Sequence, residues 1–329
     1  MSKKNNIQFF LVTIDTEGDN IWRGVDKIST QNAKYIPRFH SLCEKYHFRP
    51  TYLTNYEMAS SKDFIKFLKL TLSNNTAEVG MHLHAWNSPP YYKLSDDDQK
   101  SMPFLIEYPF DVMCEKISFL TELLQDTFEV KMLSHRAGRW AFNERYAKII
   151  SKMGYKVDCS IIPHITLDRL IYYGGKKKKI SYEKFRETPY LIDLDNIIKE
   201  DEDSSLLEIP LSSIIHEASF FSILRDINPI NSFSVKIINR LTKNPHILRP
   251  NGQNLINMKR ILRNAEINKW PCVSLMLHSS ELMPGGSPYF PNSESIENLY
   301  ADLEVLFAIA KNSFEGVTCK EFYDIYKMN

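Results

Sequence analysis

Two histidines stand one residue apart in the stretch AEVGMHLHAWNSPP, residues 77–90. Side chains at positions i and i+2 point in different directions on a helix, but on a strand they share one face with β-carbons roughly 6 to 7 Å apart. On a strand, His82 and His84 could therefore bind one metal ion between them, because imidazole is a common ligand of transition metals. The other residues that converge on them decide whether such a site forms.

The chain alternates between short apolar runs rich in β-branched residues and amphipathic stretches. We predict strands at 7–14, 49–54, 77–83, 131–136, 155–161, 206–211 and 272–277. Helices with apolar residues at three-and-four spacing are predicted between them, including 32–46, 62–72, 111–125 and 143–155. Alternation of this kind indicates an α/β protein with a parallel sheet, and about seven units favour a barrel related to the eight-unit α/β barrel.

Polar side chains cluster where four of these strands end, which is where α/β barrels carry their reactive residues. They are Asp15 and Glu17 after the first strand, His82 and His84 at the third, His135, Arg136, Arg139 and Trp140 at the fourth, and His278 and Glu281 after the seventh. A polar residue at the end of any one strand is common, because loops begin there. Their shared placement predicts one site built from carboxylates, imidazoles and guanidinium groups.

Composition and charge restrict the class of protein. The 329 residues are 43% hydrophobic and 25% charged, which is typical of a globular protein, and we predict a single domain over 1–329. The stretch 212–270 is long for one crossover, so we expect a helical excursion there. A formal net charge of +1 provides no field that would recruit nucleic acid or an anionic membrane.

Cysteine usage and the N-terminus bear on location. The five cysteines are odd in number and dispersed, which indicates neither a disulfide framework nor a cysteine zinc site. The apolar run near the N-terminus is too short to span a membrane, and no small-residue cleavage site follows it. We therefore expect a cytoplasmic protein without membrane insertion; the sequence does not predict its oligomeric state.

Five short motifs occur in order along the chain: Thr-Ile-Asp-Thr-Glu, Glu-Val-Gly-Met-His, Arg-Ala-Gly-Arg-Trp, Leu-Glu-Ile-Pro and Leu-Met-Leu-His. In this order the sequence resembles the polysaccharide deacetylase, or NodB-homology, family. It is most similar to the branch among O-antigen and capsule gene products, whose second motif reads Gly-x-His-Leu-His-x-Trp. The resemblance implies a distorted seven-stranded (β/α) barrel, similar to a TIM barrel, a divalent metal, and hydrolysis of an N-acyl group on an amino sugar.

The metal ligands implied by the resemblance need two replacements. The first family motif usually ends in two adjacent aspartates, a base and a ligand; Asp15 matches the base, but Thr16 stands at the ligand position. Glu17 is the obvious substitute, although it could instead favour a loop or helix start, and the opposite assignment of Asp15 and Glu17 stays open. The second motif usually has histidines four apart. Here Trp86 stands four residues after His82, where the second histidine would be. His84 therefore either replaces that histidine as a ligand or has a structural role.

The remaining roles follow from the same resemblance. Arg136 matches an arginine that holds the catalytic base, and His278 matches a histidine that acts as general acid. Arg139 is expected to bind substrate or form a salt bridge. Trp86 and Trp140 are expected to stack on a sugar or pack in the core. Glu281 is also expected to bind substrate, and the histidines His40, His47, His164, His216 and His246 to be structural or on the surface.

These residues predict a metal-dependent carbohydrate N-deacetylase with zinc as the expected cofactor. Asp15 would take a proton from the attacking water, and His278 would protonate the departing amine. The expected substrate is an N-acylated, in the first instance N-acetylated, amino sugar of an O-antigen or capsule intermediate. The alternatives are a deformylase or cyclic-amide hydrolase, a catalytically inactive sugar-binding barrel, and a scaffold.

Overall fold

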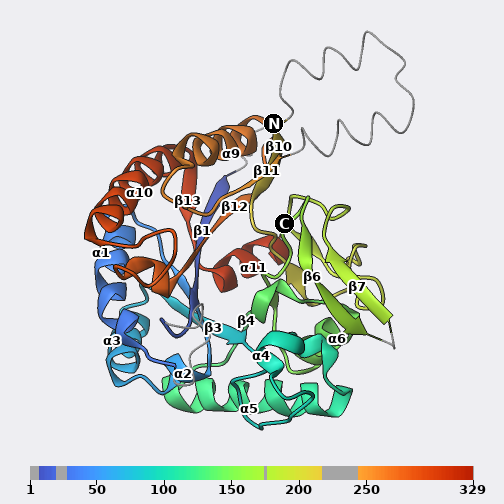
Figure 1. Ribbon diagram of the computed structural model, residues 1–329. Helices are drawn as coiled ribbons and strands as arrows, with labels where there is room; N and C mark the ends of the chain where they lie inside the picture. Colours follow the sequence, from blue (N-terminus) through green and yellow to red (C-terminus); the bar gives the residue numbers. More distant parts are fainter. Residues whose placement is uncertain (1–6, 20–27, 174–175, 217–243, 329) are drawn as a thin grey trace.

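The computed structural model describes residues 7–19, 28–173, 176–216 and 244–328. Seven parallel strands form a curled sheet in the order β12, β1, β2, β3, β4, β5, β9. Their bounds are Cys272–His278, Gln8–Thr16, Thr51–Thr54, Glu78–Leu83, Ser134–Ala137, Val157–Asp158 and Leu207–Glu208. Each lies within or overlaps one of the seven predicted strands, and the predicted α/β class with a distorted (β/α) barrel is confirmed (Figure 1).

The barrel is distorted where its sheet would close. Instead of a regular ladder between β9 and β12, Ser212 joins the two sides: its backbone N–H donates to Ser274 O (3.2 Å), and its Oγ accepts from Ser274 N (2.9 Å). Two short strands extend the sheet. β8 (Tyr190–Leu191) pairs antiparallel with β9, and β13 (Phe314–Gly316) runs parallel beside the start of β1.

Strand alternation separates two layers of packing around β1. Phe10, Val12 and Ile14 belong to the large apolar core between the sheet and the helices. Phe9 and Leu11 belong to a smaller apolar cluster inside the barrel. Because side chains alternate along a strand, the inner face of β1 continues from these two residues to Thr13 and Asp15. The barrel interior is therefore apolar at the amino ends of the strands and polar at the carboxyl ends.

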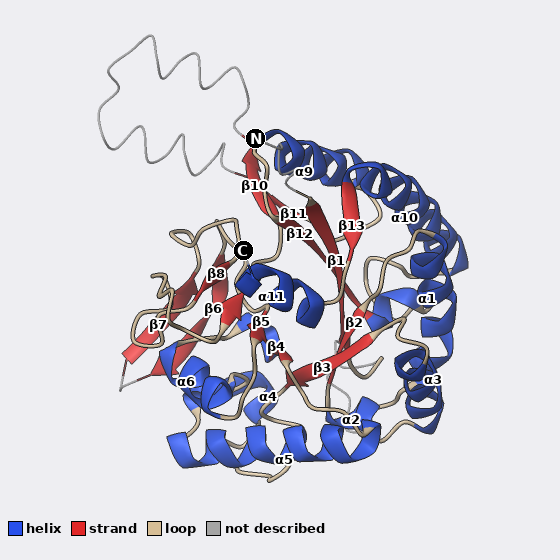
Figure 2. Ribbon diagram, turned by 180° about the vertical axis from the view of Figure 1, so that it is seen from behind, coloured by secondary structure: helices blue, strands red, loops and turns tan. Residues whose placement is uncertain are grey.

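Helices form an outer layer around the curled sheet, as both ribbon views show (Figures 1 and 2). The α-helices are α1 (Ile36–Lys45), α2 (Tyr56–Ala59), α3 (Lys62–Ser73), α4 (Asp98–Ser101), α5 (Phe110–Phe128), α6 (Glu144–Lys152), α9 (Leu255–Ile267), α10 (Ser293–Ser313) and α11 (Cys319–Met328). The 3-10 turns are η2 (Gln31–Tyr35), η3 (Leu105–Glu107), η4 (Gly138–Trp140) and η5 (Ser279–Leu282). Among the described residues, no helix combines the length and apolar character needed to cross a membrane.

The last helix, α11, covers the amino ends of the strands. The backbone N–H of Cys319 donates to Thr51 Oγ1 at the start of β2 (3.2 Å), and that of Lys320 donates to Glu78 Oε2 at the start of β3 (2.9 Å). Phe322 fills the apolar cluster inside the barrel. With this end closed, the carboxyl ends of the strands are the end that a substrate can reach.

Two segments differ from the sequence prediction. No strand was predicted between 161 and 206, but β6 (Thr166–Tyr173) and β7 (Lys176–Ser181) pair antiparallel there. In the expected helical excursion, α9 is accompanied by an antiparallel pair, β10 (Ser213–His216) with β11 (Asn244–Ile247). The part between these two strands lies outside the described residues, so the excursion and the single domain over 1–329 stay predictions.

Candidate metal centre

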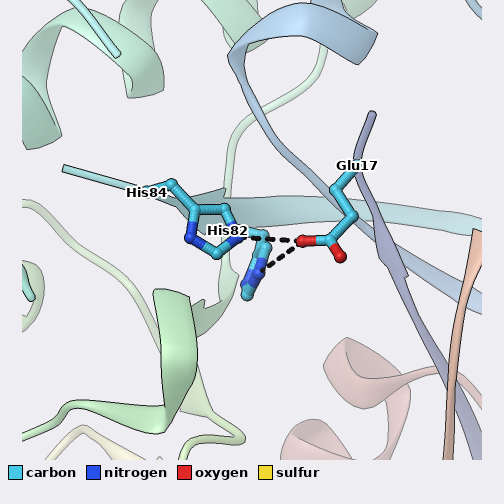
Figure 3. Close-up of side chains that lie close together, drawn as sticks. All are labelled: Glu17, His82 and His84. Atoms are coloured by element: carbon cyan, nitrogen blue, oxygen red, sulfur yellow. Dashed lines mark hydrogen bonds and ion pairs between the residues drawn. The ribbon is translucent and has the colours of Figure 1, made fainter. Parts of the chain in front are cut away.

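Glu17, His82 and His84 form the one group of potential metal ligands found among the described residues. One ligand atom from each lies within 4.8 Å of the others, and all three side chains are buried. His84 Nε2 lies 2.8 Å from Glu17 Oε2, and His82 Nε2 lies 3.6 Å from the same oxygen (Figure 3). The two histidines occupy β3 and the residue just past it, so the predicted spacing of i and i+2 does bring both rings to one point.

Backbone contacts orient the two rings. His82 Nδ1 lies 3.0 Å from the carbonyl oxygen of Arg136, and a carbonyl can only accept, so the ring proton is on Nδ1 and Nε2 keeps its lone pair. His84 packs against Gly138, where an added β-carbon would lie 2.2 Å from Leu83 O and 3.0 Å from His84 Nδ1. Only glycine allows the chain after β4 to approach the end of β3 this closely.

The backbone of Glu17 is fixed by residues that the motif search did not single out. Its N–H donates to Ser279 Oγ (3.0 Å), and its carbonyl accepts from Asn32 Nδ2 (2.7 Å) and from Ser279 Oγ (3.1 Å). Asp19 in turn accepts from the backbone N–H of Gln31 (2.5 Å), which holds the start of η2 beside the loop. The carboxylate of Glu17 is thereby aimed at the histidines rather than being a loose loop residue.

One carboxylate oxygen of Asp15 is engaged outside the group formed by Glu17, His82 and His84. The register of β1 and β12 places it beside His278, and its Oδ1 accepts from Arg136 Nη1 at 2.5 Å. Arg136 is fully buried and also donates from Nε to Cys159 O (2.8 Å) and from Nη2 to Thr13 Oγ1 (2.7 Å). Burial alone would raise the pKa of Asp15, but Arg136, with the two nearest histidines, holds that pKa below its ordinary value. Asp15 is therefore ionised.

The charges around Glu17 also favour its ionised form. Burial opposes the charge, yet His278, His82 and His84 together hold the pKa of Glu17 well below its ordinary range. Burial lowers the pKa of His84, which favours the neutral imidazole that a metal requires. The pKa of His82 is raised despite burial, because Asp15 and Glu17 lie beside it. A bound cation would compete with the proton for the ring nitrogen of His82.

His278 is placed by two residues of opposite charge. Arg249 Nη2 donates to His278 Nδ1 (2.9 Å) and to Glu281 Oε1 (2.5 Å), and the backbone N–H of His278 donates to Glu281 Oε2 (2.8 Å). Arg249 was missed, because an isolated arginine within 212–270 carries no motif. The expectation that Glu281 binds substrate is wrong, since its side chain is fully buried and both oxygens are engaged within the protein.

The ligand group, Asp15 and His278 all line one cavity of about 490 Å³, a size usual for ligand sites. Trp86, Arg139 and Trp140 also line it, as the expected substrate contacts should. Arg139 and Trp140 have φ values of 56° and 61°, which non-glycine residues rarely adopt. This strained turn presents both side chains at the cavity, and the Trp140 ring covers the Arg136 guanidinium at 4.8 Å.

The other histidines with described contacts lie away from this cavity. His135 faces the opposite side of β4 from Arg136, as alternation predicts, and bonds Asp158 and Tyr146. His40 bonds Tyr52 and Thr76, and His164 bonds Glu187. These roles are structural, as expected for His40 and His164; His135 had been grouped with the residues at the strand ends, with no role assigned to it. Asp97 caps α4 by accepting from Lys100 N, so the Asp96–Asp98 run begins a helix rather than binding metal.

Comparison with protein-family models and with curated proteins gives no match for this chain. Solved structures do match. A candidate polysaccharide deacetylase from Mycobacterium smegmatis is 13% identical with a TM-score of 0.53, covering 100% of this chain and 93% of its own. A candidate glycoside hydrolase/deacetylase from Parabacteroides distasonis is 11% identical with a TM-score of 0.62, covering 98% and 72%. At these identities the likeness shows the fold, which is the curled α/β barrel shared with both proteins.

Proposed function

We propose that this protein is a metal-dependent hydrolase that removes an N-acyl group from an amino sugar. The observation that carries the proposal is the convergence of Glu17, His82 and His84 in one cavity with Asp15, a separate carboxylate held by arginine. Amide hydrolysis at a metal needs these two parts, a set of ligands and a base that is not one of them. The fold shared with candidate deacetylases supports the same reading.

The three side chains fit a divalent cation, and zinc is the metal we propose. One carboxylate and two imidazoles are donors that zinc accepts in catalytic sites, and all three converge within one small space here. The hydrogen bond from His82 Nδ1 to a carbonyl is the outer contact that usually orients a histidine ligand. When bound, such a cation supplies a Lewis acid that polarises the amide carbonyl and makes water a stronger nucleophile.

Asp15 is the proposed base. Arg136 holds Oδ1, while Oδ2 stands 3.8 Å from Nε2 of both His82 and His278, outside hydrogen-bonding distance. Oδ2 is thus the oxygen that can accept a proton from the attacking water. The buried guanidinium keeps the carboxylate charged before the reaction and in place during it.

His278 is the proposed proton donor to the departing amine. Arg249 donates to Nδ1, which places the ring proton on Nε2, 3.8 Å from Asp15 Oδ2 and 3.7 Å from Glu17 Oε1. Glu281 Oε2 lies 3.6 Å from Nδ1, so Arg249 and Glu281 together hold this edge of the ring and leave Nε2 directed at the cavity.

The finer identity of the substrate rests on the sequence motifs. The His-Leu-His-x-Trp pattern supports an N-acetylated amino sugar of an O-antigen or capsule intermediate, met in the cytoplasm. Trp86 and Trp140 offer aromatic faces to a sugar ring, and Arg139 offers a cation. An N-formyl or cyclic amide would use the same base and ligands.

Mass spectrometry of a substrate panel tests the proposal. Zinc-loaded protein, metal-stripped protein and the Asp15→Asn variant would each be incubated with N-acetylated and N-formylated amino sugars, free, oligomeric and nucleotide-linked. We expect a free amine from at least one substrate with zinc-loaded protein only. Stoichiometric metal with no product from any substrate would contradict the hydrolase, and saccharide binding without turnover would favour a binding protein.

A further inference from the structure

A second, smaller cavity adjoins the proposed active site. It has a volume of about 320 Å³ and shares Trp86 and Gln99 with the main cavity. Its remaining walls come from the loop after β3, including Tyr91, Tyr92 and Asp96. The two cavities thus adjoin at Trp86 and Gln99, and we refer to the second one, with this border, as the groove.

Tyr91 and Tyr92 expose unusual amounts of aromatic surface in this groove. Tyr91 is 72% exposed and Tyr92 is 46% exposed. Single exposed apolar residues are common on protein surfaces, but adjacent exposed rings beside a concave site mark a binding surface. Together with Trp86, they place three aromatic side chains along the groove.

The loop that carries the two tyrosines is held on both sides. Lys116 of α5 is fully buried and donates from Nζ to Ser88 O (2.6 Å) and Pro90 O (2.7 Å). Burial lowers the pKa of Lys116 to about 8. On the other side of the tyrosines, Asp98 accepts from the backbone N–H groups of Leu94 (3.0 Å) and Ser95 (2.6 Å).

Burying a lysine costs free energy, and packing alone would be better served by an apolar residue. The contacts of Lys116 fix the backbone beside Tyr91 and Tyr92 instead. A loop ordered before binding loses less entropy when a ligand arrives. The two tyrosines are therefore presented in a fixed position rather than left on a floppy connector.

We propose that this groove is a second saccharide subsite, so that the substrate of the proposed deacetylase carries at least two sugar units. One unit lies at the metal ligands, and its neighbour stacks its apolar ring face on Tyr91 and Tyr92. Lys93, Ser95 and Asp96 line the same cavity and can bond sugar hydroxyls. This inference rests on the proposed function for the hydrolysis of the bound sugar. Binding of a second sugar unit in the groove does not depend on that hydrolysis.

Charge argues against a nucleotide in the same place. The loop carries three consecutive acids, Asp96 to Asp98, and its two lysines are engaged with them: Lys93 with Asp96 (3.0 Å) and Lys100 with Asp97 (2.7 Å). A diphosphate linked to a base on the tyrosines would lie beside this acidic run and be repelled. A neutral sugar chain would not be repelled by these acids.

Binding measured apart from turnover tests the subsite. The metal-loaded protein would be applied to an array of N-acetylated amino sugars in chains of one to four units with varied linkages, together with UDP-N-acetylglucosamine. We expect at least one series in which two or more units bind on the order of 10-fold more tightly than one unit, equivalent to about 1.4 kcal/mol. The Tyr91→Ala, Tyr92→Ala double variant should lose that preference and bind single units unchanged.

Matched variants sharpen the result. Tyr91→Phe with Tyr92→Phe keeps the rings and should keep the length preference, and Tyr35→Ala, at a residue 40% exposed that lines neither cavity, should also keep it. Equal affinity for all lengths, a preference that survives the double alanine variant, or tightest binding of the sugar nucleotide would overturn the subsite. Length-dependent binding without hydrolysis would keep the subsite and refute the deacetylase; hydrolysis without length dependence would do the reverse.

Discussion

Two clusters of buried ionisable residues lie on opposite faces of the same curled sheet. On the helix side, His135 bonds Asp158 through Nδ1 (2.6 Å) and Tyr146 through Nε2 (2.9 Å), and Asp158 also accepts from Ser160. On the barrel side, Asp15 Oδ2 stands 3.8 Å from the nearest histidine nitrogens. Both ring nitrogens of His135 are engaged within the protein, whereas Asp15 Oδ2 lies at a cavity without a hydrogen-bond partner at that distance.

Burial and residue type therefore do not distinguish a structural cluster from a candidate active site. The two clusters differ in whether polar atoms without a hydrogen-bond partner face a cavity. Glu208, beside Asp158, has its pKa raised well above the ordinary value by burial and by the charge of Asp158. The groups around Asp15 and Glu17, in the candidate metal centre, instead lower the pKa values of these two carboxyls.

The largest difference should come from the same substitution made in each cluster. His84→Gln should abolish metal binding and activity, because an amide is a poor zinc ligand and three protein ligands leave little redundancy. His135→Gln should keep the metal and lower the free energy of unfolding by about 1 to 3 kcal/mol. Metal analysis and denaturant unfolding of both variants measure this. Full metal occupancy in His84→Gln would make His84 structural.

Removing His278 should affect catalysis without affecting the metal. We expect His278→Ala to bind metal as the wild type does and to lose roughly 10²- to 10⁴-fold in kcat, the range for removal of a general acid. Metal content and single-turnover rates of the purified variant check this. Loss of the metal would show that His278 is a ligand and would extend the ligand group to the end of β12.

Arg249 should act through His278. Arg249→Met removes the donor to Nδ1, and we expect kcat to fall by about 10- to 100-fold with metal retained. Because Glu281 would be left as a buried unpaired charge, the variant with Glu281→Gln added serves as the stability control. In the His278→Ala background, Arg249→Met should cause no further loss of rate. A full additional loss there would assign Arg249 a separate contact with substrate.

The smallest expected effect concerns Glu57, a half-buried acid at the border of the site. Burial raises its pKa to about 7, although Asn87 Nδ2 donates to both of its oxygens at 3.0 Å. A raised acid pKa means that the folded protein binds the proton more tightly, so this contribution to stability is present below pH 4.5 and is lost as the pH rises through 7. Relative to Glu57→Gln, the metal-free wild type should lose on the order of 1 to 3 kcal/mol between pH 5 and 8. Parallel pH profiles would contradict the shifted pKa.

Much of the architecture could be predicted from the sequence because it depends on local pattern. The seven β-branched runs became the seven parallel strands, and most of the predicted residues at their ends line one cavity, with His135, Arg136 and Glu281 as exceptions. His82 and His84 were recognisable because strand spacing alone brings i and i+2 to the same face. The antiparallel pairing of β6 with β7 could not be predicted, because a run of lysines is typical of a solvated loop.

The residues that position the site could not be predicted in the same way. Ser279 and Asn32 matter because they hold the backbone of Glu17, and Arg249 matters because it reaches His278 from the segment just after β11. Glu281 was misassigned because nothing in its sequence context shows that it turns inward to Arg249. These roles depend on tertiary contacts between distant segments, which no local pattern records.

The central claim is that Asp15 is the base and Glu17 is a metal ligand, and metal titration of two variants tests it most directly. Asp15→Asn should bind zinc as tightly as the wild type and lose nearly all turnover, because the amide cannot accept the proton from water. Glu17→Gln should bind zinc more weakly and recover part of its activity at excess metal. The opposite pairing, with zinc lost from Asp15→Asn and retained by Glu17→Gln, would contradict the account and make Asp15 the ligand.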